Sequence, residues 1–159
     1  MLKIIKQISI VALSLFLSGI AMANASEYKK GSIIVENPWV RASHSGANSI
    51  GGYAHIINKG DKDEYLVSVI SPISKKIQLH EMSMKNNVMV MRHLRKPILI
   101  KAHSEFIFKP GSYHIMFMKL PKPVAKGDVF PAKFCFRDIG SIDVKFVAGS
   151  DAAVEAPKS

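Results

Sequence analysis

Most of the chain alternates between apolar and polar residues over short runs, which is the pattern of strands that bury one face. Clusters of Gly, Pro, Asn and Asp separate these runs and indicate turns. The predicted strands cover residues 31–36, 53–57, 65–70, 76–84, 97–101, 105–109, 112–120, 130–137 and 141–147. No long stretch repeats apolar residues at the 3.6 spacing of a helix. The pattern therefore favours an all-β fold, either a β-sandwich or a Greek-key barrel.

The segments between these runs are predicted to be irregular. Residues 26–30 are a polar leader before the first strand, and Asn37-Pro38 is expected to break that strand. Residues 42–52 are rich in Ser, Gly and small residues and predict a loop that leads into a strand. Trp39, the single tryptophan, is expected to anchor the core.

The first 25 residues have the form of a secretory signal peptide. Lys3 and Lys6 give a positive start, residues 8–22 are mostly apolar, and Ala23-Asn24-Ala25 has the small-x-small form of a cleavage site. We expect cleavage after Ala25. The alternative is an uncleaved N-terminal anchor, although the apolar run is short and interrupted for a span of about 20 residues.

Cleavage would leave one domain at residues 26–147 and a flexible tail at residues 148–159. Cys135 is the only cysteine, so no internal disulfide can form. The net charge falls from +10 to about +8 when Lys3 and Lys6 are removed with the signal peptide. The basic residues are scattered, with no run of five. This distribution favours a solvated surface that steers an acidic partner, and it argues against nucleic acid or stable membrane insertion as the target.

Two stretches, residues 80–91 and 113–118, hold six of the eight methionines. Residues two apart on a strand share a face. We therefore expect three such sets, each on one face of its own strand: His80, Met82 and Met84; Met89 and Met91; and His114, Met116 and Met118. Imidazole and thioether together form a soft donor set, and thioethers favour Cu(I) over hard ions. The working hypothesis is therefore a Cu(I) site on a small β-protein.

The first stretch is predicted to form a hairpin. Asn86 and Asn87 suit the two-residue turn because asparagine tolerates a positive φ. This turn sets a register in which Met84 lies opposite Met89, Met82 opposite Met91, and His80 opposite His93. Side chains opposite each other have Cβ atoms about 4.5–5.5 Å apart, which is close enough to converge on one ion.

The chain resembles the PCuAC family of periplasmic copper chaperones, also called DUF461, over about residues 31–147. The residues that carry the resemblance are Asn37-Pro38-Trp39, Gly52-Tyr53, Asn58-Lys59-Gly60, Leu79-His80-Glu81-Met82, Val88-Met89-Val90-Met91-Arg92, Pro110-Gly111-Ser112-Tyr113-His114-Ile115-Met116 and Lys126-Gly127-Asp128. The family's metal motif has the form H-x10-M-x21-H-x-M. This sequence matches it with one additional residue between Met91 and His114.

The resemblance implies that His80, Met91, His114 and Met116 bind Cu(I) on a cupredoxin-like barrel. It further implies delivery of copper to the copper-centre subunit of cytochrome oxidase in the periplasm, with a thioredoxin-like factor as a possible second partner. Some members carry a His- and Met-rich tail with a second site. Residues 148–159 contain neither residue type, so that function is not expected here.

Several alternatives stay open from the sequence. Met82, Met89 or His93 could add to the site, with Met89 in place of Met91 as the fallback. The protein could be a copper buffer, or a non-metal Ig-like binding domain in which the methionines only pack.

Enzymatic chemistry is not expected. Cys135 lacks the nearby His and Met of a blue-copper site. The sequence shows no paired catalytic carboxylates, nucleophile elbow or phosphate loop. His44, His55 and His103 are expected on the surface.

Overall fold

The structure is a computed structural model that describes residues 26–158, and their regular structure is entirely β. The strands are β1 (Glu27–Lys30), β2 (Ile33–Arg41), β3 (Ser49–Asn58), β4 (Glu64–Ile70), β5 (Lys76–Lys85), β6 (Val88–His93), β7 (Ile98–Ile100), β8 (Ser104–Phe108), β9 (His114–Met118), β10 (Val129–Phe136) and β11 (Ser141–Gly149). Within residues 26–158 we find no helix of the length and apolarity that a membrane span requires. The predicted signal peptide lies outside the described residues.

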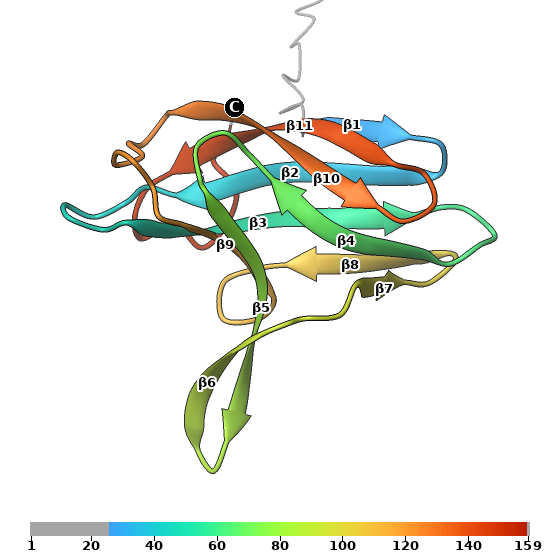
Figure 1. The fold of residues 1–159 in the computed structure, drawn as a ribbon, viewed down its shortest axis with the longest axis horizontal. Helices are drawn as coiled ribbons and strands as arrows, with labels where there is room; N and C mark the ends of the chain where they lie inside the picture. Colours follow the sequence, from blue (N-terminus) through green and yellow to red (C-terminus); the bar gives the residue numbers. More distant parts are fainter. Residues whose placement is uncertain (1–25, 159) are drawn as a thin grey trace, which may run out of the picture.

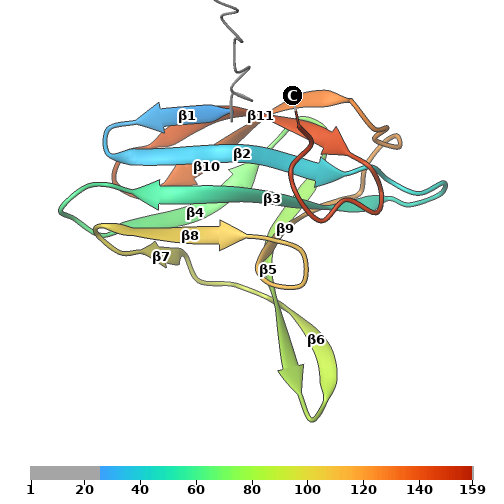
Figure 2. The ribbon, with the colours of Figure 1, turned by 180° about the vertical axis from the view of Figure 1, so that it is seen from behind.

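The strands form one sheet that folds over into two layers. The order along the sheet is β6-β5-β9-β3-β2-β11-β10-β4-β7, with β1 added to β2 and β8 added to β3. All pairs are antiparallel except β2 with β11. Figures 1 and 2 show β10 and β4 on one side of the molecule and β2, β3 and β8 on the other. The predicted all-β, cupredoxin-like barrel or sandwich is confirmed.

The core lies between the two layers and is rich in phenylalanine. β10 and β11 alternate between exposed and buried residues, as a strand with one buried face does. Their inward residues include Phe130 and Phe146, whose rings stack with centroids 5.6 Å apart. Phe117 of β9 packs edge-on against both rings, at 5.6 and 5.3 Å. These contacts hold β9 firmly on the core.

One prediction about the N-terminal region was wrong. The first strand does not end at Asn37-Pro38: β2 runs through to Arg41, and the register with β3 shifts between Glu36 and Trp39. Asn37 adopts a φ of 47°, so the extra residue forms a bulge and the strand resumes beyond it. The polar leader, to which the sequence assigned no element, forms β1 and pairs with β2.

After β11 the chain turns back toward β2. The Nε of Arg41 donates a hydrogen bond of 2.7 Å to the carbonyl of Ala153, and Ala153 and Ala156 pack against the core. Ala148 and Gly149 belong to β11. The division of the chain into a domain at residues 26–147 and a flexible tail stays a prediction.

Candidate metal centre

The strand β9 presents two of the predicted ligands because its alternation is fixed by the core. Ile115 and Phe117 are completely buried and point inward, so His114 and Met116 occupy the opposite face. Phe117 also lies close to Gly52 of β3: a Cβ at Gly52 would approach its ring to 2.5 Å. The glycine therefore lets β9 sit deep on the core, and this depth fixes the position of His114.

His80 lies at the centre of a row of three histidines. β5 is flanked by β6 and β9, and His80 pairs with His93 on one side and with His114 on the other. The ring centroid of His80 lies 5.6 Å from that of His93 and 5.6 Å from that of His114. His80 and His114 are each only 7% exposed, whereas His93 is exposed.

The hairpin that carries Met91 has the predicted register. Asn86 and Asn87 form its turn with φ values of 49° and 61°, as a two-residue hairpin turn requires. Met82 pairs with Met91, and Met84 with Met89. The Sδ of Met91 lies 3.3 Å from the Nε2 of His114, although β5 separates their two strands.

The ring of His114 is oriented by the backbone. Its Nδ1 lies 3.0 Å from the carbonyl oxygen of Ser112, which can only accept a hydrogen bond. We therefore assign the proton to Nδ1, which leaves Nε2 with its lone pair directed at the sulfur of Met91. Two electron-pair donors in contact do not stabilise each other, but a soft cation can bind both.

The surroundings of His80 also suit a residue that binds a metal ion. Its Nε2 lies 3.2 Å from the side-chain oxygen of Gln78, so we assign the proton to Nε2. Its Nδ1 is buried and has no hydrogen-bond partner among residues 26–158. Buried polar atoms are rarely left unpaired in native proteins, so this atom needs an explanation. Burial, followed by the neighbouring His114 and His93, lowers the pKa of His80 below 6.5, which keeps the ring in its neutral, metal-binding form.

Met116 lies on the same face of the sheet as His80 and His114. It follows His114 by two positions on β9 and pairs with Gln78 of β5 and Gly51 of β3. The structure therefore brings His80, Met91 and His114 together, with Met116 at the adjacent position in the sheet.

Three contacts that support the site were not predicted from the sequence. Gln78 contacts His80, and the carbonyl of Ser112 orients His114. On the other face of the hairpin, Arg92 forms a 2.5 Å ion pair with Glu81, and this hydrogen bond holds the pKa of Glu81 below its usual range. The predicted hairpin register would have placed Glu81 opposite Arg92, so that pair was detectable. The sequence indicated Gln78 only weakly, through its position two residues before His80 on the same face of the strand.

The remaining histidines are engaged with carboxylates. His44 pairs with Asp151, and His103 with Asp61, both at the surface as predicted. His55 is partly exposed between Glu36 and Glu105, at 3.3 and 2.8 Å, so it too is engaged at the surface. Among residues 26–158, no group of three or more His, Cys, Asp or Glu side chains is placed to hold a metal ion.

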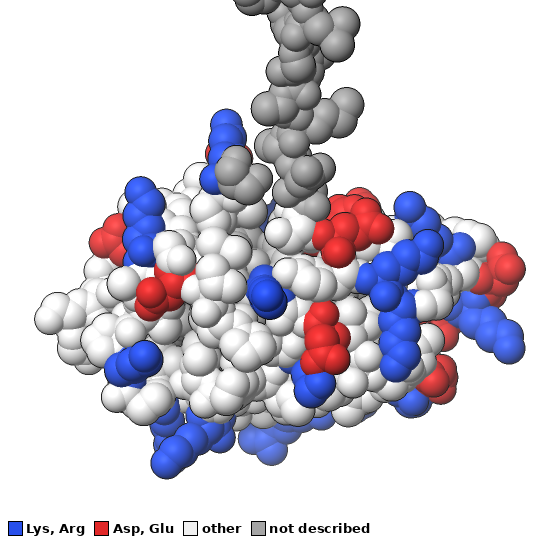
Figure 3. All heavy atoms as spheres, turned by 90° about the horizontal axis from the view of Figure 1, so that it is seen from above, with Lys and Arg blue, Asp and Glu red and all other residues white. Residues whose placement is uncertain are grey.

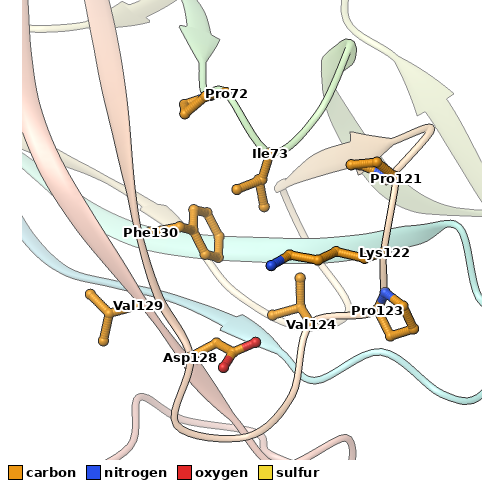
Figure 4. A pocket seen from close by; sticks show the side chains of 9 residues that line it. All are labelled: Pro72, Ile73, Pro121, Lys122, Pro123, Val124, Asp128, Val129 and Phe130. Carbon is orange, nitrogen blue, oxygen red and sulfur yellow. The ribbon is translucent and has the colours of Figure 1, made fainter.

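The molecule also has a pocket of about 380 Å³ outside this face. Figure 4 shows it between the loop before β5 and the loop before β10. It is lined by Pro72, Ile73, Pro121, Lys122, Pro123, Val124, Asp128, Val129 and Phe130. These residues include no histidine or methionine, so the pocket offers no soft ligand.

Comparison with known proteins identifies the family. The family described as "Putative lipoprotein LpqE-like" matches residues 33–148. The protein "Putative lipoprotein Lxx21020" of Leifsonia xyli subsp. xyli is 26% identical over 98% of this chain and 89% of its own length. "Uncharacterized protein RP573" of Rickettsia prowazekii is 30% identical over 64% of this chain and 58% of its own length.

Solved structures of PCuAC domains share the fold. The copper-bound PCuAC domain from PmoF2 has a TM-score of 0.68 and 22% identity, over 79% of this chain and 98% of that domain. The solution structure of CuI-DR1885 from Deinococcus radiodurans has a TM-score of 0.58 and 19% identity, over 75% of this chain and 79% of that one. The fold is thus that of the PCuAC domains. The chain belongs to the LpqE-like family of PCuAC proteins, and the resemblance seen in the sequence is confirmed.

Proposed function

We propose that this protein binds one Cu(I) ion through His80, Met91, His114 and Met116 and carries it to an acceptor. The observation that carries the proposal is the contact of the Nε2 of His114 with the Sδ of Met91. The buried, unpartnered Nδ1 of His80 on the neighbouring strand supports it. The copper-bound PmoF2 domain and CuI-DR1885 add support, because both have the same fold.

The donor set suits a carrier of Cu(I). Cu(I) is a closed-shell soft ion that accepts thioether and imidazole ligands. All four ligands are neutral, so the charge of the ion is not compensated and the ion can leave more readily than from thiolates. Thioethers also avoid disulfide formation in an oxidising compartment, although they can be oxidised to sulfoxide.

The exposure of the ligands favours a carrier over a closed store. Met91 is 51% exposed, whereas both histidines are 7% exposed. A ligand from an acceptor can therefore approach from the side of Met91 and displace its sulfur first. The two histidines would hold the ion until the incoming ligand binds.

The location and acceptor belong to the same proposal. We place the protein in the periplasm after cleavage behind Ala25, and the lipoprotein description of its family supports export. The proposed acceptor is the copper-centre subunit of cytochrome oxidase, with a thioredoxin-like assembly factor as a second partner. We propose no enzymatic reaction for the site.

Anaerobic titration with Cu(I) against a chromophoric chelator tests the binding step. The chain from Ser26 onward should bind one tight equivalent, which Met91→Ser and His114→Ala weaken strongly. His103→Ala is the matched control, since the side chain of His103 pairs with Asp61 at the surface. Wild-type affinity in the Met91 and His114 variants would overturn the ligand assignment. Failure of the protein to compete with the chelator would instead favour a non-metal binding domain.

A further inference from the structure

The hairpin of β5 and β6 extends away from the body of the molecule (Figures 1 and 2). The pairing of β5 with β9 ends at His80 and His114, and β5 continues to Lys85 paired only with β6. Within residues 26–158, the outer half of the hairpin is thus a two-stranded ribbon that pairs with no further strand.

One face of this ribbon carries four methionines, which we call the hairpin methionines. They form two adjacent cross-strand pairs, Met82 with Met91 and Met84 with Met89. Successive pairs two residues apart lie on the same face, and paired Cβ atoms are about 4.5–5.5 Å apart. The same face continues through His80 and His114, so the four methionines extend the face that carries the proposed Cu(I) site.

Packing does not account for the outer pair. Met84 is 62% exposed and Met89 is 49% exposed, so neither fills a gap in the core. Met82 is half-buried. Methionine has three rotatable bonds, so thioethers on paired positions can reach one ion without moving the backbone.

We propose that Met82, Met84 and Met89 form a second soft-metal site, which binds Cu(I) without any histidine. Thioether sulfur is the donor that selects Cu(I), and three such donors lie within two cross-strand pairs. Met91 stands between this hairpin site and the histidines. Its sulfur can bind an ion in either position, so an ion can pass between the sites by exchange of neutral ligands with no change of oxidation state.

The second site goes beyond the proposed function, because it does not require the histidines. Only the passage of the ion between the two sites rests on the proposed Cu(I) site. The experiment must therefore report separately on Met84 and Met89 of the hairpin site and on Met91 and Met116 of the proposed Cu(I) site.

Titration with Ag(I), followed by NMR of ¹³C-methyl methionine, separates the two sites. Ag(I) is a soft closed-shell ion like Cu(I), and each methionine methyl gives its own signal. We expect two equivalents to bind to the chain from Ser26 onward. One should shift the signals of Met91 and Met116, and the other those of Met84 and Met89.

The test variant is Met84→Leu with Met89→Leu, which keeps the size of both exposed side chains and does not threaten the fold. It should bind one equivalent. Met118→Leu is the matched control and should bind two, because Met118 pairs with Lys76 at the opposite end of β5.

Unmoved signals of Met84 and Met89 during binding of two equivalents would overturn the hairpin site, as would two equivalents in the double leucine variant. If Met84 and Met89 respond while Met91 and Met116 do not, the hairpin site stands and the proposed inner site fails.

Discussion

The Nε2 of His114 and the Sδ of Met91 lie 3.3 Å apart, although 22 residues separate them in sequence and β5 separates their strands. β5 lies between the strands of these two residues and carries His80, which is only 7% exposed. Burying an imidazole without a partner for one nitrogen is unfavourable, and a bound cation would supply that partner. This relationship leads to predictions about the ligands, their support and their protonation.

Gln78 is predicted to tune the metal affinity through His80. Gln78→Ala removes the oxygen that accepts the hydrogen bond from the Nε2 of His80. Loss of such a supporting contact lowers metal affinity by about 10–100-fold in other sites. Chelator competition should show this loss, while the urea midpoint stays close to that of the wild type. An unchanged affinity would mean that Gln78 does not orient the ring.

The ion pair of Glu81 and Arg92 is predicted to contribute little stability but to restrain Met91. The side chain of Arg92 is 68% exposed, and exposed ion pairs contribute roughly 0.2–1 kcal/mol. Arg92→Gln should therefore change the free energy of unfolding by less than about 1 kcal/mol. It should still weaken Cu(I) binding, because Arg92 follows Met91 directly. A matched variant, Arg95→Gln, should do neither, and equal affinity in both variants would contradict the prediction.

Acidification is predicted to destabilise the metal-free protein through His80. Burial lowers the pKa of His80 in the folded state, while the unfolded chain keeps a value near 6.5. Between these two values the unfolded state binds the additional proton, so stability rises with pH. The contribution is complete above about 6.5 and is lost as the pH falls through the folded pKa.

Urea unfolding across this pH range measures the effect. His80→Gln removes the group, so the variant should lose less stability on acidification than the wild type does. Parallel curves for the two proteins would show that His80 titrates in the same way in both states.

Gly52 is predicted to be required for the position of β9. A Cβ at Gly52 would lie 2.5 Å from the ring of Phe117, so Gly52→Ala forces that ring or its strand to move. Overpacking of this kind costs about 1–3 kcal/mol. Thermal unfolding should show the loss, and Ser49→Ala at the start of the same strand should not. A stable Gly52→Ala protein would indicate that the core relaxes easily.

Transfer of copper to an acidic acceptor is predicted to slow as salt is added. The net charge is +10 for the full chain and about +8 without Lys3 and Lys6. Figure 3 shows lysine and arginine side chains spread over one face among fewer acidic groups. Steering by such a surface acts through space and is screened over about 10 Å at 0.1 M salt. Stopped-flow transfer rates measured at several salt concentrations would test this, and a flat response would exclude steering.

The sequence by itself determined the strands and the hairpin. Alternation predicted most strands to within a few residues, and Asn86-Asn87 fixed the register that places Met82 opposite Met91. Both are local properties: the period of a strand and the φ that a two-residue turn requires. The continuation of β2 past Asn37-Pro38 was not predictable in this way, because pairing with β3 outweighs the local break.

Only the tertiary structure decided what surrounds His80. The sequence places His114 more than thirty residues away, and the pairing of β5 with β9 depends on Ile115 and Phe117 packing in the core. That packing buries His80, leaves its Nδ1 without a partner and sets the Nε2 of His114 against the sulfur of Met91. Contacts between distant strands follow from how the whole sheet folds over its core, which no local pattern contains.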